Sequence, residues 1–153
     1  MKIGIAADHA GYKNKEELKL FLDKQGYQYE DFGAHTMDPE DDYSDVVMPL
    51  ALAISNQKID KGIAICGSGV GVSIAANKFE GVRAALISEH YSAHQGVEHD
   101  DLNLLCMGGR VLGAALIEEI TVAFLKAKFI SHGRFQRRLD KVKAIEEMNF
   151  KKL

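Results

Sequence analysis

The chain has 153 residues, of which 46% are hydrophobic and 27% are charged, and its formal net charge is −3. This composition is that of a globular protein, and the length predicts a single domain over residues 1–153. Residues 1–50 carry five Lys or Arg against eleven Asp or Glu, whereas residues 126–153 carry nine against three. One basic segment on an otherwise acidic chain argues against nucleic-acid binding and favours a local anion site near the C-terminus.

The first apolar run bears on the cellular location of the protein. Residues 3–7 are apolar, but the run stops at Asp8 and His9. It is therefore too short for a membrane span or for the core of a signal peptide. Cys66 and Cys106 lie far apart in a chain without an export signal, so we expect two free thiols. These features predict a cytoplasmic protein that does not bind membranes.

Strand and helix patterns alternate along the chain. Short apolar runs predict buried strands at 2–7, 27–32, 62–66, 83–87 and 103–107. Helical patterns lie between them, at 13–25, from Ser44 or Asp45 to about 54, after Cys66, at about 89–98 and at about 113–126. Pro49 is expected in or near the first turn of the second helix, where its missing N–H matters least.

A last helix at about 134–148 has no strand after it. Its apolar stripe should dock on the domain or on a neighbouring subunit, and it consists of Phe135, Leu139, Val142 and Ile145. The alternation as a whole predicts an α/β protein with a three-layer αβα, Rossmann-like fold, a five-stranded parallel sheet and an extra C-terminal helix. Ligands of such folds bind outside the carboxyl ends of the strands.

The segment after the third predicted strand carries the strongest chemical signal. Cys66 ends that strand, and Gly67, Ser68, Gly69, Val70 and Gly71 lead into a helix. The glycines allow a tight loop whose exposed N–H groups can hold an anion or a developing oxyanion. The helix N-terminus could also stabilise a Cys66 thiolate that acts as a base. The spacing fits neither a P-loop nor a dinucleotide loop. A buried cysteine that merely fills the strand end is the alternative.

Other polar groups are expected at the same edge of the sheet. Asp8 and His9 follow the first strand, although Asp8 could equally be only a helix cap. Arg134 and Arg138 are one helical turn apart and could clamp a phosphate together with Arg110, or could form an exposed basic face.

Histidines are concentrated near the fourth predicted helix. His99, beside Asp100, is a candidate acid–base group because a histidine changes its charge near neutral pH; its alternative is a solvated surface histidine. His90, His94 and Glu98 follow each other at intervals of four, but an exposed polar helix face explains this spacing as well as a metal triad does. We therefore expect no metal.

Taken together, these segments resemble the type B ribose-5-phosphate isomerases and their relatives that isomerise galactose 6-phosphate and allose 6-phosphate. The resemblance covers nearly the whole chain. Its blocks include the opening segment through Asp8, His9 and Gly11, the loop from Cys66 to Gly71, and Gly81 to Ala84. Further blocks are His99 to Asn103, Gly109 to Gly113, and Gly133 with Arg134 and Arg138.

The resemblance implies a role for each candidate residue. Cys66 would take the substrate proton, His99 would assist opening of the sugar ring, and the loop 67–71 would hold the enediolate oxygens. Asp8 would contact the sugar, Tyr43 would lie near the pocket, and the phosphate would be held by His9, Arg110, Arg134 and Arg138. The family needs no cofactor and is dimeric or tetrameric with a shared site, so His99, Asp100 and Arg110 are expected from a partner subunit. Asp100 stands where the family usually has Asn.

The expected reaction is therefore interconversion of ribose 5-phosphate and ribulose 5-phosphate, a step of the pentose phosphate pathway. Moving a proton between C2 and C1 through an enediolate needs one base and a rigid set of donors, which the predicted site supplies. Three alternatives stay open, of which the first two are isomerisation of a six-carbon sugar phosphate and a non-catalytic phosphosugar-binding module. A structural role for the C-terminal helix in assembly alone is a third.

Overall fold

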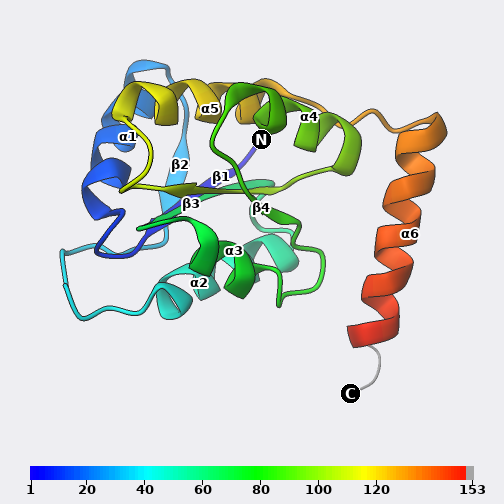
Figure 1. Ribbon diagram of the computed structural model, residues 1–153, viewed down its shortest axis with the longest axis horizontal. Coiled ribbons are helices and arrows are strands. Elements are labelled where there is room, and N and C mark those ends of the chain that lie inside the picture. The colour runs from blue at the N-terminus through cyan, green and yellow to red at the C-terminus, as the bar shows by residue number, and fades with distance from the viewer. Residues whose placement is uncertain (151–153) are drawn as a thin grey trace.

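The computed structural model describes residues 1–150, in which five parallel strands form one sheet (Figure 1). The strands are β1 (Ile3–Ala7), β2 (Tyr29–Asp31), β3 (Lys61–Cys66), β4 (Ala84–Leu86) and β5 (Leu104–Gly108). The helices are α1 (Tyr12–Lys24), α2 (Tyr43–Ser55), α3 (Val70–Ala76), α4 (His90–Asp100), α5 (Ala114–Lys126) and α6 (Gly133–Phe150). The strand order is β2-β1-β3-β5-β4, and each neighbouring pair is parallel. The predicted fold class is confirmed.

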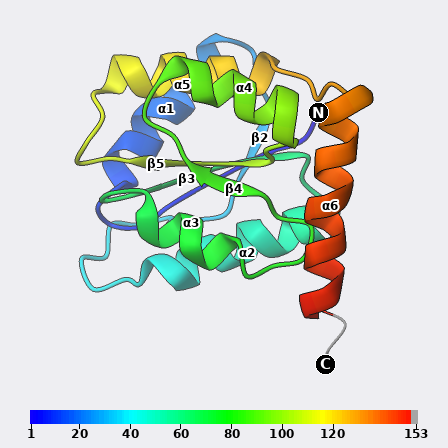
Figure 2. The ribbon, with the colours of Figure 1, turned by 45° about the vertical axis from the view of Figure 1, so that its right-hand side comes forward.

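Helices α1, α4 and α5 cover one face of the sheet, and α2 and α3 cover the other (Figures 1 and 2). Alternate residues of a strand point to opposite faces, so each central strand contributes to two cores. Ile63 and Ile65 pack in the core on the side of α1, α4 and α5. Ala64 and Cys66 pack in the core on the side of α2 and α3. Cys66 is thus placed beneath the start of α3, at the carboxyl end of its strand.

Helix α2 begins earlier than its sequence pattern predicts. Its first residue is Tyr43 and its N-cap is Asp42, instead of a start after Ser44 or Asp45. Pro49 therefore lies inside the helix, and its expected position in the first turn is wrong. The Tyr43 ring packs so closely on Gly71 that a Cβ there would lie 2.8 Å from it. This contact joins the start of α2 to the start of α3, across a distance in sequence that a local pattern does not cover.

Helix α6 stands beside the layered body instead of covering a face of the sheet (Figure 2). Leu139 is buried, with 3% of its surface exposed, but Val142 and Ile145 on the predicted stripe are more than half exposed. A hydrogen bond of 2.7 Å from the Gly81 N–H to Glu146 Oε1 ties α6 to the loop after α3. Only the first part of the stripe docks on this chain.

None of the described helices is both long and apolar enough to cross a membrane.

Candidate active site

A cavity of about 450 Å³ opens at the carboxyl ends of the three central strands. Its walls come from the ends of β1, β3 and β5 and from the start of α2, and the lining residues are Asp8, His9, Ala10, Tyr43, Cys66, Gly67, Ser68, Gly71, Arg110 and Val111. The helix after β3 lies on the opposite face from the helices after β1 and β5 (Figure 1). A crevice forms between neighbouring strands whose following helices lie on opposite faces of the sheet, and open parallel sheets bind ligands in this crevice.

Cys66 lies at the base of this cavity with 4% of its surface exposed. Its Sγ accepts a hydrogen bond of 3.1 Å from the main-chain N–H of Gly69. Within residues 1–150, the main-chain N–H groups of Gly67 and Ser68 donate no hydrogen bond. The sulfur and free N–H donors therefore lie together at one edge of the cavity. This is the arrangement that a base beside an oxyanion site requires.

Glycine is needed in this loop because other backbone passes close to it. Gly69 has a φ of +81°, a left-handed conformation that L side chains rarely adopt. A Cβ there would also lie 2.8 Å from the carbonyl carbon of Met107. Gly71 is constrained differently, by the Tyr43 ring. The loop is held from β5 and from α2, so its shape is fixed before any ligand binds.

Asp8 lines the cavity and stabilises the turn before α1, whereas the alternative that it is only a helix cap is wrong, because Gly11 is the N-cap of α1 and has no side-chain cap hydrogen bond. Asp8 is 5% exposed, and its Oδ1 accepts hydrogen bonds from the N–H groups of Ala10, at 3.0 Å, and Gly11, at 3.1 Å. Burial raises the pKa of the Asp8 carboxyl above its ordinary value, against the opposing effect of those N–H groups and of His9.

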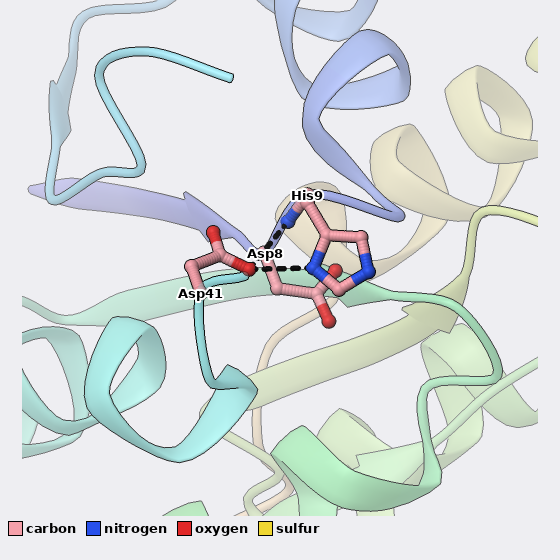
Figure 3. Close-up of side chains that lie close together, drawn as sticks. All are labelled: Asp8, His9 and Asp41. Atoms are coloured by element: carbon pink, nitrogen blue, oxygen red, sulfur yellow. Dashed lines mark hydrogen bonds and ion pairs between the residues drawn. The ribbon is translucent and has the colours of Figure 1, made fainter. Parts of the chain in front are cut away.

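His9 is held by Asp41, a residue that the sequence pattern did not single out. Asp41 Oδ1 lies 2.6 Å from Nδ1 of His9 and also accepts the main-chain N–H of His9 at 3.0 Å (Figure 3). The hydrogen bond to Asp41 is the main cause that raises the pKa of His9 above its ordinary value. Asp8, His9 and Asp41 could each bring one ligand atom within 4.8 Å of the others. Because Nδ1 and Oδ1 already bond each other, we interpret the group as a hydrogen-bonded cluster.

Arg110 lines the same cavity within its own chain. Its Cδ and Nη1 lie 3.6 Å from the position that a Cβ on Gly67 would take. The main-chain N–H of Arg110 donates to the Gly67 carbonyl at 3.0 Å, which ties the end of β5 to the loop. The expectation that Arg110 reaches the site from a partner subunit is therefore corrected, because it already stands beside Cys66 of its own chain.

The remaining predicted site residues form a separate cluster. The His99 ring stacks on the Phe135 ring with 4.2 Å between centroids, and the Arg134 guanidinium lies 4.9 Å from the centroid of that same ring. The side-chain nitrogen of Gln95 lies 2.7 Å from Nδ1 of His99. Asp100 and Arg138 are exposed at the end of α4 and on α6. None of these residues lines the cavity around Cys66.

Topology explains the separation of the two clusters. A helix that follows a parallel strand runs back toward the amino edge of the sheet. His99 lies in the last turn of α4, so it is carried to the edge opposite Cys66. The chain reaches α6 from the end of α5, at that same edge, where Lys61 at the start of β3 donates to the Phe124 carbonyl at 2.7 Å. One chain therefore carries two clusters of predicted site residues, which are candidate half-sites, at opposite edges of its sheet.

A larger groove, of about 630 Å³, lies between α4 and α5 and is lined in part by His90, His94 and Glu98. His94 Nδ1 lies 3.2 Å from Glu98 Oε2, as the i, i+4 spacing allows. The groove contains neither Cys66 nor a glycine loop. We place the chemistry in the smaller cavity for that reason.

Comparison of the sequence and structure with known proteins identifies relatives of this chain. Residues 3–142 match the family described as Ribose/Galactose Isomerase. Ribose-5-phosphate isomerase B of Escherichia coli is 41% identical over 146 residues, which cover 95% of this chain and 97% of that protein. The structure of Clostridium thermocellum ribose-5-phosphate isomerase B is 44% identical with a TM-score of 0.91, over 97% of this chain and 99% of that one.

A solved relative also carries a ligand. Ribose-5-phosphate isomerase B of Mycoplasma genitalium, with bound ribulose 5-phosphate, is 39% identical with a TM-score of 0.89, over 95% of this chain and 96% of that one. Other relatives are named for other sugars: 4-deoxy-4-sulfo-D-erythrose isomerase of a Clostridium species is 36% identical, and D-erythrulose-4-phosphate isomerase of Pectobacterium atrosepticum is 35% identical.

Proposed function

Because this chain belongs to the ribose/galactose isomerase family, we propose that it interconverts ribose 5-phosphate and ribulose 5-phosphate. The observation that carries this proposal is the cavity in which the Cys66 sulfur, the free N–H groups of the loop and the cationic side chain of Arg110 lie together. Relatives named for this activity, over nearly the full length of both chains, support the same substrate.

The Cys66 thiolate is the proposed base. It would take the proton from C2 of the open-chain aldose, and the electron pair of that C–H bond would form the C1–C2 double bond of an enediolate. Negative charge would develop on the oxygen at C1, within reach of the N–H groups of Gly67 and Ser68. The hydroxyl proton would then move from the oxygen at C2 to the oxygen at C1, and return of the carbon-bound proton from Cys66 to C1 would give the ketose and regenerate the thiolate. The reaction is redox-neutral overall.

The phosphate end would be held away from the reacting carbons by Arg110 and His9, and this binding positions C2 against the sulfur. His99 would assist ring opening, and Arg134 and Arg138 would add to the phosphate site. Since these three residues lie at the other edge of the sheet, we propose that they act in the site of a second copy of this chain. The exposed stripe of α6, with Val142 and Ile145, is the proposed contact surface.

A coupled assay on ribose 5-phosphate, run with EDTA, tests the proposed base. Replacing the thiol in Cys66→Ala should lower kcat by at least about 10²-fold, the usual contribution of a positioned base. Cys106→Ala is the matched control, because Cys106 is also buried but does not line the cavity. It should retain activity at a modest cost in stability. Turnover by Cys66→Ala at the wild-type rate would contradict the role of the thiol.

The same assay separates the candidate substrates. Wild-type protein should turn over ribose 5-phosphate with a higher kcat/KM than allose 6-phosphate, galactose 6-phosphate or a four-carbon sugar phosphate. A preference for one of the latter would keep the isomerase mechanism and change the substrate. Tight binding of all of them without turnover would instead support a phosphosugar-binding module.

A further inference from the structure

Asp41 holds His9 at two points. Its Oδ1 accepts the main-chain N–H of His9 at 3.0 Å and lies 2.6 Å from the ring Nδ1 (Figure 3). Within residues 1–150 the Asp41 carboxylate accepts no other hydrogen bond, and its Oδ2 is shielded from solvent without a partner. One carboxylate thus fixes both the backbone and the ring of a histidine that lies 32 positions away in sequence.

This contact decides which ring nitrogen carries a proton. An ionised carboxylate can only accept hydrogen bonds, so Nδ1 of His9 must be the donor. Nε2 lies on the side of the ring away from Asp41 (Figure 3) and is left for a ligand of the cavity that His9 lines. Protonation of Nε2 would turn it into a second, charged donor.

The charges around His9 favour that protonated form. Asp41 and Asp8 both raise the pKa of His9, with the hydrogen bond to Asp41 as the largest cause, while burial and Arg110 lower it. The other titratable groups lining the cavity are Tyr43 and Cys66. Since a raised pKa keeps the imidazolium populated to higher pH, His9 is favoured as a second cation beside Arg110 when an anionic ligand binds.

We propose that Asp41 is a positioning residue that holds His9 as an oriented, cationic donor to the anionic group of the substrate. The inference rests on the proposed function for the identity of that group, a phosphate monoester. Asp41 acts only through His9. Its Oδ1 accepts both hydrogen bonds from His9, and the positive charge of the imidazolium offsets the negative charge of the Asp41 carboxylate near a phosphate.

Wild-type protein provides a first test that does not depend on a variant. Imidazole nitrogen NMR of His9 during a pH titration should show a neutral form protonated on Nδ1. Addition of inorganic phosphate should shift the Nε2 resonance and raise the pH at which His9 titrates. A neutral form protonated on Nε2, or a His9 resonance that ignores phosphate, would overturn the proposal.

Asp41→Asn tests the electrostatic part, with Glu40→Gln as the matched control. Glu40 is an exposed carboxylate one position earlier in the same loop, so its replacement removes the same charge without touching His9. Asp41→Asn should lower the pH at which His9 titrates and raise KM for ribose 5-phosphate about tenfold near neutral pH, as the loss of one charge-assisted contact predicts. The change in kcat should be smaller.

The pH profile separates positioning from general structural damage. In acidic solution His9 is protonated in both proteins, so the KM ratio of Asp41→Asn to wild type should fall toward one, while Glu40→Gln stays near one throughout. An equal KM ratio at every pH, or an unchanged titration of His9 in Asp41→Asn, would refute the proposal. Absence of wild-type turnover would defeat the proposed function alone, because the NMR titrations still decide the role of Asp41.

Discussion

Gly69 shows how strongly a single position can control the site. Its left-handed φ and the backbone of Met107 leave no room for a Cβ. Gly81 has a similar φ, of +77°, but nothing lies within 4 Å of the corresponding Cβ position. The two glycines therefore separate backbone strain from steric overlap, which makes them a matched pair for substitution.

We expect Gly81→Ala to lower the free energy of unfolding by about 1–2 kcal/mol, the cost of a left-handed L residue. Gly69→Ala should cost about 3 kcal/mol or more, because backbone must also move. It should reduce kcat as well, since the Gly69 N–H bonds the Cys66 sulfur. Urea unfolding and the isomerase assay measure both effects. Equal stability and equal activity for the two variants would contradict this account of the loop.

The sequence placed a polar residue at the correct edge of the sheet where that residue lies at the end of a strand. Asp8 and His9 directly follow β1 and Cys66 is the last residue of β3, so alternation of strand and helix is enough to bring them to one edge. Asp41 follows no strand directly: it lies ten residues beyond β2, in an irregular acidic segment. Its pairing with His9 depends on the path of that segment across the sheet edge, which no local pattern specifies.

Between elements, a buried ion pair joins α1 to β2. Lys15 has no exposed side-chain surface, and its Nζ donates to both oxygens of Asp31, at 2.8 and 2.9 Å, and to the Ala34 carbonyl at 2.7 Å. Lys19 contacts the same carboxylate at 2.8 Å but is 24% exposed. The two lysines thus differ mainly in burial.

Lys15→Met should lower the free energy of unfolding by about 3 kcal/mol, because it leaves a partly buried carboxylate without the fully buried lysine that pairs with it. Lys19→Met, the control, should cost less, about 1 kcal/mol, because Lys19 is partly solvated and Lys15 still pairs with Asp31 in this variant. Denaturant unfolding of both variants at neutral pH measures this difference. Similar costs for both would show that burial does not set the strength of this network.

The same network predicts an acid dependence of stability. Burial alone would raise the pKa of Asp31, but Lys15, Lys19 and the Gly33 N–H outweigh it, so the pKa lies below its ordinary value. A lowered pKa means that the stabilisation is complete above about pH 4, where the unfolded Asp is already ionised, and is lost as the pH falls through the folded pKa. The difference in stability between wild type and Lys15→Met should therefore narrow in acid. A constant difference down to acid pH would argue against this linkage.

The sequence predicted helices and strands well where the sequence pattern is continuous. It predicted them less well where a contact between distant segments accompanies the end or the packing of an element. The strands and α1 fall within a few residues of their expected bounds. Helix α2 starts at Tyr43, whose ring packs on the distant Gly71, and α6 buries little besides Leu139 on its own chain. Periodicity finds an apolar face but does not say what covers it.

At the scale of the whole molecule, the strand order explains why the predicted site residues of one chain form two separate clusters, the candidate half-sites. The sequence predicts five parallel strands, but the order β2-β1-β3-β5-β4 depends on packing between distant segments. Cys66, His9 and Arg110 share the carboxyl edge, whereas His99 and Arg134 share the other end of the molecule. A symmetric pair of chains can join the half-sites if α4 and α6 of one chain reach the cavity of the other, which gives two equivalent composite sites.

Mixing two inactive variants tests this arrangement. In a dimer, a Cys66→Ala chain still supplies His99, and a His99→Asn chain still supplies Cys66. Random mixing makes half of the dimers heterodimers, and in each of these one of the two composite sites has both wild-type residues. The mixture should thus regain about one quarter of wild-type activity, which follows from two-fold symmetry. Refolding the variants together, with each refolded alone as control, makes the measurement. A mixture as inactive as its components would mean that Cys66 and His99 do not act across a subunit boundary, and would leave catalysis to the residues around Cys66 of a single chain.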